Sequence, residues 1–138
     1  MRRLMIMLSL IAVVCSCSRN IEVIGQINES ADIFPDYQGV TIPVNIAPMN
    51  FQVMGDASDI KVMVVTEDSE TVIKADNGLI RFGKRFWKSL LRDNIGKDIT
   101  FTVCEKAKDG WHAYEPFMMH VANEEIDPYI AYRLIPPG

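Results

Sequence analysis

The chain has 138 residues, of which 18 are acidic and 14 basic, so its formal net charge is −4. This length allows one domain with a hydrophobic core, and the acidic balance argues against binding of nucleic acid and against a polybasic membrane-binding face. Of the three cysteines, Cys15 and Cys17 lie near the N-terminus, which leaves Cys104 without a partner for an internal disulfide.

The N-terminal residues have the layout of a secretory signal. Arg2 and Arg3 supply a positive start, and an apolar run follows from Leu4 to Val14. This run is too short for a permanent transmembrane helix, which needs about 20 apolar residues. We therefore predict a signal peptide over residues 1–16, whose removal leaves twelve basic and eighteen acidic residues in the mature chain.

Cys17 is the predicted point of lipid attachment. The end of the signal resembles a bacterial lipobox, in which the cysteine after a small residue becomes the lipidated N-terminus. Cys17 follows Ser16, whereas Cys15 follows the bulky Val14. One acyl chain holds a protein only marginally at a membrane, and the resemblance implies three. The alternatives are an ordinary signal peptide or a short N-terminal anchor.

Residues 17–32 form a polar stretch with scattered apolar side chains. We interpret this stretch as a tether between lipid and domain, and residues 33–138 as the folded domain. Lipoproteins on the surface of Bacteroidetes often carry acidic residues directly after the cysteine, but here the order is Ser18-Arg19-Asn20-Ile21-Glu22. This difference favours an outer-membrane location that faces the periplasm.

Short segments with alternating apolar and polar residues dominate the domain. Strands are predicted over residues 40–46, 50–54, 60–66, 71–75, 79–82, 98–105, 111–114, 117–122 and 129–135. The first of these should be an edge or irregular strand, because its proline cannot donate to a ladder. Asp76-Asn77-Gly78 predicts a tight hairpin turn.

One helix is predicted over Lys84–Arg92. Its apolar residues fall on one stripe with the cations outside it, and Gly96 is the predicted stop. Many short strands at this spacing with one helix between them predict a mainly β fold. We expect an antiparallel β-sandwich of the immunoglobulin or fibronectin kind with one short helix.

Three passages carry a resemblance to a known family: Asp36 to Pro43 running into Asn45 to Phe51, then Phe86 to Leu91, then Trp111 through Glu125 to Ile135. Together they resemble the leading domain of Bacteroidetes lipoproteins whose remainder is a TolB-type β-propeller. Some of these are labelled cytochrome c biosynthesis protein, yet the Cys-x-x-Cys-His pattern for haem attachment is absent here. The resemblance implies a truncated or split relative without the propeller, and it supplies no catalytic residues.

Two groups of residues are candidates for binding an envelope protein. Val40, Ile42 and Val44 lie on the proline-bearing segment, where a partner could dock on a sheet edge by strand addition. Lys84, Arg85 and Lys88 lie on the predicted helix, either as a solvated face or as a docking patch for an acidic partner or lipid headgroups.

An alternative function uses Cys104, His112 and His120 in an accessory redox or ligand-binding protein. Their spacing matches no standard zinc arrangement, so we predict no metal and no cofactor. Glu124, Glu125 and Asp127 are interpreted as an acidic turn, with Arg133 as a partner for one of them. The aromatic residues that we assign to the core are Trp87, Trp111, Phe117 and Tyr129.

No nucleophile elbow, phosphate loop or Ser/His/Asp pattern occurs in the chain. The sequence therefore predicts a membrane-anchored, non-catalytic lipoprotein domain, a binding or assembly module of the cell envelope. A further alternative is a fragment with no independent role, which would aggregate when expressed alone.

Overall fold

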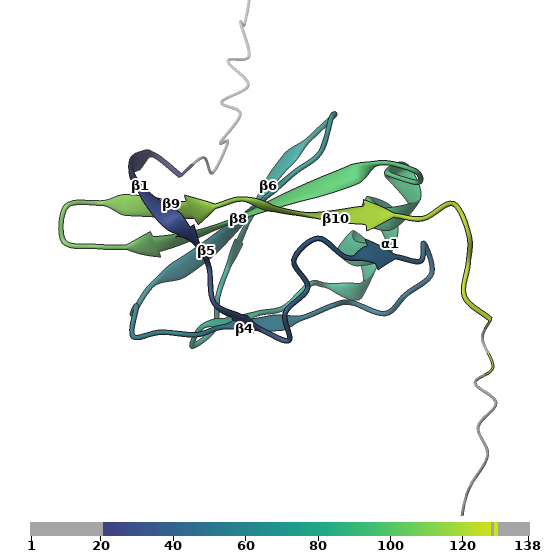
Figure 1. The fold of residues 1–138 in the computed structure, drawn as a ribbon, viewed down its shortest axis with the longest axis horizontal. Helices are drawn as coiled ribbons and strands as arrows, with labels where there is room; N and C mark the ends of the chain where they lie inside the picture. The colour runs from purple at the N-terminus through teal and green to yellow at the C-terminus, as the bar shows by residue number, and fades with distance from the viewer. Residues whose placement is uncertain (1–20, 128, 130–138) are drawn as a thin grey trace, which may run out of the picture.

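The computed structural model describes residues 21–127 and residue 129, and it is built mainly from strands (Figure 1). In these residues the elements are β1 (Val23–Ser30), β2 (Ile33–Phe34), β3 (Thr41–Ile42), β4 (Phe51–Val53), β5 (Ile60–Val65), β6 (Glu70–Lys74), β7 (Leu79–Ile80), α1 (Lys84–Asp93), β8 (Asp98–Lys106), β9 (Trp111–Glu115) and β10 (Phe117–Val121). The prediction of a mainly β fold with one short helix is confirmed.

The larger sheet has seven strands with β8 at its centre. Strand β8 pairs antiparallel with β5 on one side and with β9 and β10 on the other, and β6 extends the sheet beyond β5. The outer strands β1 and β3 pair in parallel with β9 and β10. The sheet is therefore mixed, with antiparallel pairing in the middle and parallel pairing at one edge.

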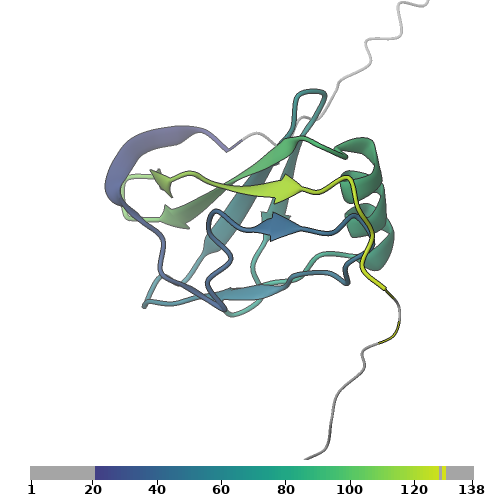
Figure 2. The ribbon, with the colours of Figure 1, turned by 45° about the vertical axis from the view of Figure 1, so that its right-hand side comes forward.

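The smaller sheet consists of β2, β4 and β7, which pair antiparallel. It lies beneath the larger sheet as a second layer, with α1 at one end of both (Figure 2). The ring of Phe51 on β4 meets the ring of Phe117 on β10 at a centroid distance of 6.0 Å. This contact joins the two layers, as in a β-sandwich.

Five aromatic rings form the centre of the core. Phe101 of β8 stacks on Phe117 at a centroid distance of 5.4 Å, and its other neighbour is Phe82 at 6.0 Å. Phe82 in turn packs against Trp87 of α1 at 4.8 Å. Both sheets and the helix therefore contribute to one continuous aromatic cluster.

The chain passes from the larger to the smaller sheet at the predicted Asp76-Asn77-Gly78 turn. Asn77 and Gly78 have φ values of 49° and 78°, and Asp76 and Leu79 form an antiparallel bridge. Positive φ at both central residues is the geometry that the Asn-Gly pair favours. The turn prediction is therefore confirmed, although its flanking strands β6 and β7 belong to different sheets.

Two segments differ from their predictions. Part of the predicted tether is folded, because Val23–Ser30 is β1 and pairs with β9. The strand predicted over residues 40–46 is only Thr41–Ile42, and Pro43 follows it directly. The strand predicted over residues 129–135 lies almost wholly outside the described residues, except for the exposed Tyr129.

Candidate binding groove

A groove of about 540 Å³ lies between residues 44–48 and one side of α1. Its lining is mainly apolar on the loop side and mixed on the helix side. The loop contributes Val44, Asn45, Ile46, Ala47 and Pro48, the helix contributes Lys84, Trp87, Lys88 and Arg92, and Ile95 and Glu125 complete the lining. A concave apolar surface with a few polar groups is the usual form of a binding site.

The loop wall is held at both ends and in the middle. The buried indole of Trp87 donates its N–H to the carbonyl of Ile46 at 3.1 Å. The side chain of Asn45 bonds both backbone groups of Ile126 at 2.9 Å, and Asn50 accepts the N–H of Phe82 at 2.8 Å. These bonds fix the loop against the core, so the groove is preformed.

Lys84 and Lys88 give the groove a positive end. Among the described residues, neither ammonium group has a carboxylate within 4.0 Å. The two lysines are four positions apart, so their side chains lie on the same side of the helix. Their charges are available to a ligand at the groove.

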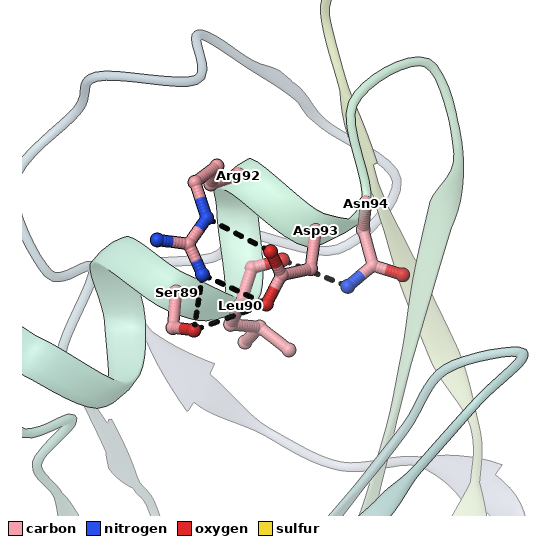
Figure 3. A network of polar contacts seen from close by, with 5 residues as sticks. All are labelled: Ser89, Leu90, Arg92, Asp93 and Asn94. Carbon is pink, nitrogen blue, oxygen red and sulfur yellow. Dashed lines mark hydrogen bonds and ion pairs between the residues drawn. The ribbon is translucent and has the colours of Figure 1, made fainter.

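Arg92 also lines the groove, but its charge is paired elsewhere (Figure 3). Its guanidinium Nε donates to Asp93 at 2.9 Å, and Ser89 donates to the same carboxylate at 3.0 Å. The hydrogen bond from Arg92 holds the pKa of Asp93 below its usual value, and Asp93 raises the pKa of Arg92. The helix end near Arg92 is therefore close to neutral, unlike the end with the two lysines.

The first turn of α1 is unusual for a helix start. Gly83 precedes it without a side-chain cap, and the turn contains Lys84 and Arg85 but no acidic residue. A cation near a helix N-terminus is unfavourable by about 0.3–1 kcal/mol, because the helix dipole is positive there. A contact with an anionic ligand would compensate for this cost.

Two other hollows lie close to α1 and the larger sheet, and they are weaker candidates. One, of about 390 Å³, lies beside Ser89 and Asp93, whose polar groups already bond each other. The other, of about 470 Å³, contains Lys97 and His120. These two residues are paired with Glu67 and Asp98 respectively. Both hollows therefore offer fewer unpaired charges than the groove.

The structure brings together three of the six predicted partner-binding residues, since Val44, Lys84 and Lys88 all line the groove. Ile42 is 2% exposed and Val40 is half-buried against the core, and neither lines the groove. Arg85 is exposed but does not line the groove.

The residues of the alternative redox site are not brought together. His120 bonds Asp98 at 2.8 Å, and Asp98 lies six residues before Cys104 on β8, about 20 Å along a strand. His112 lies beside Cys104 in the ladder but pairs with Glu105, so it faces the other side of the sheet. The described residues contain no cluster of three or more acidic, histidine or cysteine side chains that could hold a metal.

The structure also locates the predicted core aromatic residues and the predicted acidic turn. Trp87 and Phe117 are buried as predicted, whereas Trp111 is half-buried beneath the ammonium of Lys61, 4.4 Å from its ring. Tyr129 is 84% exposed, so its assignment to the core is wrong. Asp127 accepts the N–H of Tyr129 at 2.9 Å, which confirms its predicted role in the turn. Arg133 lies outside the described residues.

Sequence reasoning missed the loop wall of the groove. Ile46, Ala47 and Pro48 form most of it, yet their pattern indicated only an irregular strand. The available signal was the pair of prolines, Pro43 and Pro48, which separates this segment from the sheet on both sides.

Within the described residues, no helix is both long and apolar enough to cross a membrane.

Comparisons with known proteins do not assign this groove to a known class. Neither a scan of protein-family models nor a search of curated proteins finds a match to the chain.

The buried thiol of Cys104 should be unreactive near neutral pH. Burial raises its pKa from 9.0 to about 11, so the thiolate fraction at pH 8 falls about a hundredfold. Because burial favours the neutral form, the Cys104 thiol contributes to the free energy of unfolding below pH 9. This contribution is lost as the pH rises from 9 to 11. With Cys15 and Cys17 replaced by serine, a thiol reagent at pH 8 should react at least about a hundredfold more slowly with folded protein than with protein in urea. Similar rates would contradict the prediction.

Lys84→Glu should stabilise the fold. The substitution places an acid at the first helical position and converts a Lys84–Lys88 repulsion into an attraction. The free energy of unfolding should rise by about 1 kcal/mol, measured by urea denaturation at low salt. Lys108→Glu, in the exposed β8–β9 turn, is the matched control and should change it little. A loss of stability in Lys84→Glu would show that the lysine has a structural partner.

Proposed function

We propose that the protein is a lipid-anchored, non-catalytic binding module of the bacterial cell envelope, and that the groove beside α1 is its partner-binding site. The observation that carries this proposal is the groove, which is preformed, apolar and positively charged at one end. The partner is an envelope protein. The anchor is the lipid on Cys17, and the location is the outer membrane, facing the periplasm.

The folded domain begins close to the proposed anchor. Six peptide units separate Cys17 from Val23, the first residue of β1, so they span at most about 22 Å. In both ribbon views β1 lies at one end of the sandwich and α1 at the opposite end (Figures 1 and 2). The groove beside α1 is therefore separated from β1, so that an anchor attached before β1 would leave the groove accessible to a partner.

Lipid attachment is tested by replacing each N-terminal cysteine in turn. In Cys17→Ala, incorporation of labelled fatty acid and partition into the membrane fraction should both be lost. Cys15→Ala is the matched control and should retain both, because Cys15 follows the bulky Val14 rather than a small residue. Loss in Cys15→Ala with retention in Cys17→Ala would contradict the proposed register.

Partner binding at the groove is tested by photo-crosslinking in intact cells. A photoreactive amino acid at Ala47, an exposed position on the loop wall, should give a defined crosslinked product with an envelope protein. The same group at Lys108, in a turn outside the groove lining, is the control and should give none. Equal products from both positions, or none from either, would contradict a binding function for the groove.

A further inference from the structure

The groove lies between two walls that differ in chemistry. The loop wall is apolar, and the helix wall has two exposed cations, Lys84 and Lys88, above the buried ring of Trp87. A ligand that matches both walls must carry anionic groups on one side and apolar groups on the other. Charge complementarity therefore disfavours a purely apolar or a cationic occupant.

The spacing of the lysines matches an extended peptide. Residues four apart in a helix are separated by about 6 Å along its axis. Side chains on one face of an extended chain repeat every second residue, at about 6.6–6.8 Å. Two carboxylates at alternate positions of such a chain would meet Lys84 and Lys88, and the side chains between them would point towards the opposite, apolar wall.

The net charge of the chain also favours an acidic peptide over a membrane surface as the occupant. The chain has a formal net charge of −4, so an anionic bilayer would be repelled by most of its surface. A short acidic segment, by contrast, meets only the local charge of the groove. Glu125 also lines the groove, and its neighbour Ile126 is bonded to Asn45 of the loop wall, whereas Lys84 and Lys88 are on α1, so the acids of the ligand belong at the two lysines.

We propose that the groove binds an extended segment of a partner protein in which acidic residues alternate with apolar residues. This inference rests on the proposed binding function and specifies the chemistry of the occupant. It requires the acids to face α1 and the apolar side chains to face residues 44–48. The order of residues matters as much as their composition.

The test uses the full-length, detergent-solubilised protein and fluorescent, end-capped peptides, with binding measured by anisotropy. Leu-Glu-Leu-Glu-Leu is the probe. Leu-Gln-Leu-Gln-Leu removes the charges, and Leu-Leu-Leu-Glu-Glu keeps the composition but breaks the alternation. The probe should bind at least about tenfold more tightly than either control, and binding should weaken with added salt.

The matched protein variants are two lysine pairs. Lys84→Gln with Lys88→Gln should weaken binding of the probe at least about tenfold. Lys106→Gln with Lys108→Gln, which removes the same charge outside the groove lining, should leave it unchanged. All four lysines are exposed, so both variants should fold. Circular dichroism and urea denaturation check this.

Several outcomes would overturn the inference. They are equal binding of the glutamine peptide, equal binding of the unalternated peptide, and no effect of the Lys84 and Lys88 substitutions. Another is lysine-dependent binding of anionic phospholipid vesicles without binding of the probe, which would assign the groove to lipid headgroups. If crosslinking at Ala47 succeeds while the probe fails, the proposed function stands and this inference fails. If both fail, both are wrong.

Discussion

The burial of Trp87 is the constraint on which both the core and the groove depend. Its ring packs against Phe82 in the aromatic cluster, and its N–H bonds the carbonyl of Ile46. A buried indole N–H without an acceptor would be costly, so the ring and the loop must be placed together. The same side chain that joins the helix to the two sheets therefore also fixes the wall of the groove.

A preformed wall changes the energetics of binding. A loop that had to become ordered around a ligand would consume part of the interaction energy in lost conformational entropy. Here the bonds of Asn45 and Trp87 supply that order in the folded protein. The cations on the first turn of α1 have the opposite effect, because they lower the stability of the helix while they remain available for a ligand. Stability is thus reduced locally at the surface where an anion could restore it.

Much of the fold could be predicted because its central elements have regular periodicity. The alternation of β8, the apolar stripe of α1 and the Asn77-Gly78 turn each follow from local rules. The parallel pairing of β1 could not be predicted, since its residues are mostly polar and its register is irregular. Lys84 and Lys88 were selected from their charge, as part of either a solvated face or a docking patch. The loop wall was not predicted, because its position depends on hydrogen bonds between residues far apart in the sequence, from Trp87 to Ile46 across 41 residues and from Asn45 to Ile126 across 81.

The chain is acidic overall, whereas its groove carries two lysines, and this difference affects which partners can bind. At physiological salt, charges are screened beyond about 8 Å, so two lysines attract an acidic segment only near contact. Long-range steering by an acidic domain would instead oppose the approach of an acidic partner. Attachment to the same membrane would overcome this opposition, since it confines both proteins and raises their effective concentration. In the proposed function the lipid anchor and the groove are therefore complementary: the anchor would provide encounter, and the groove would provide discrimination among the proteins encountered.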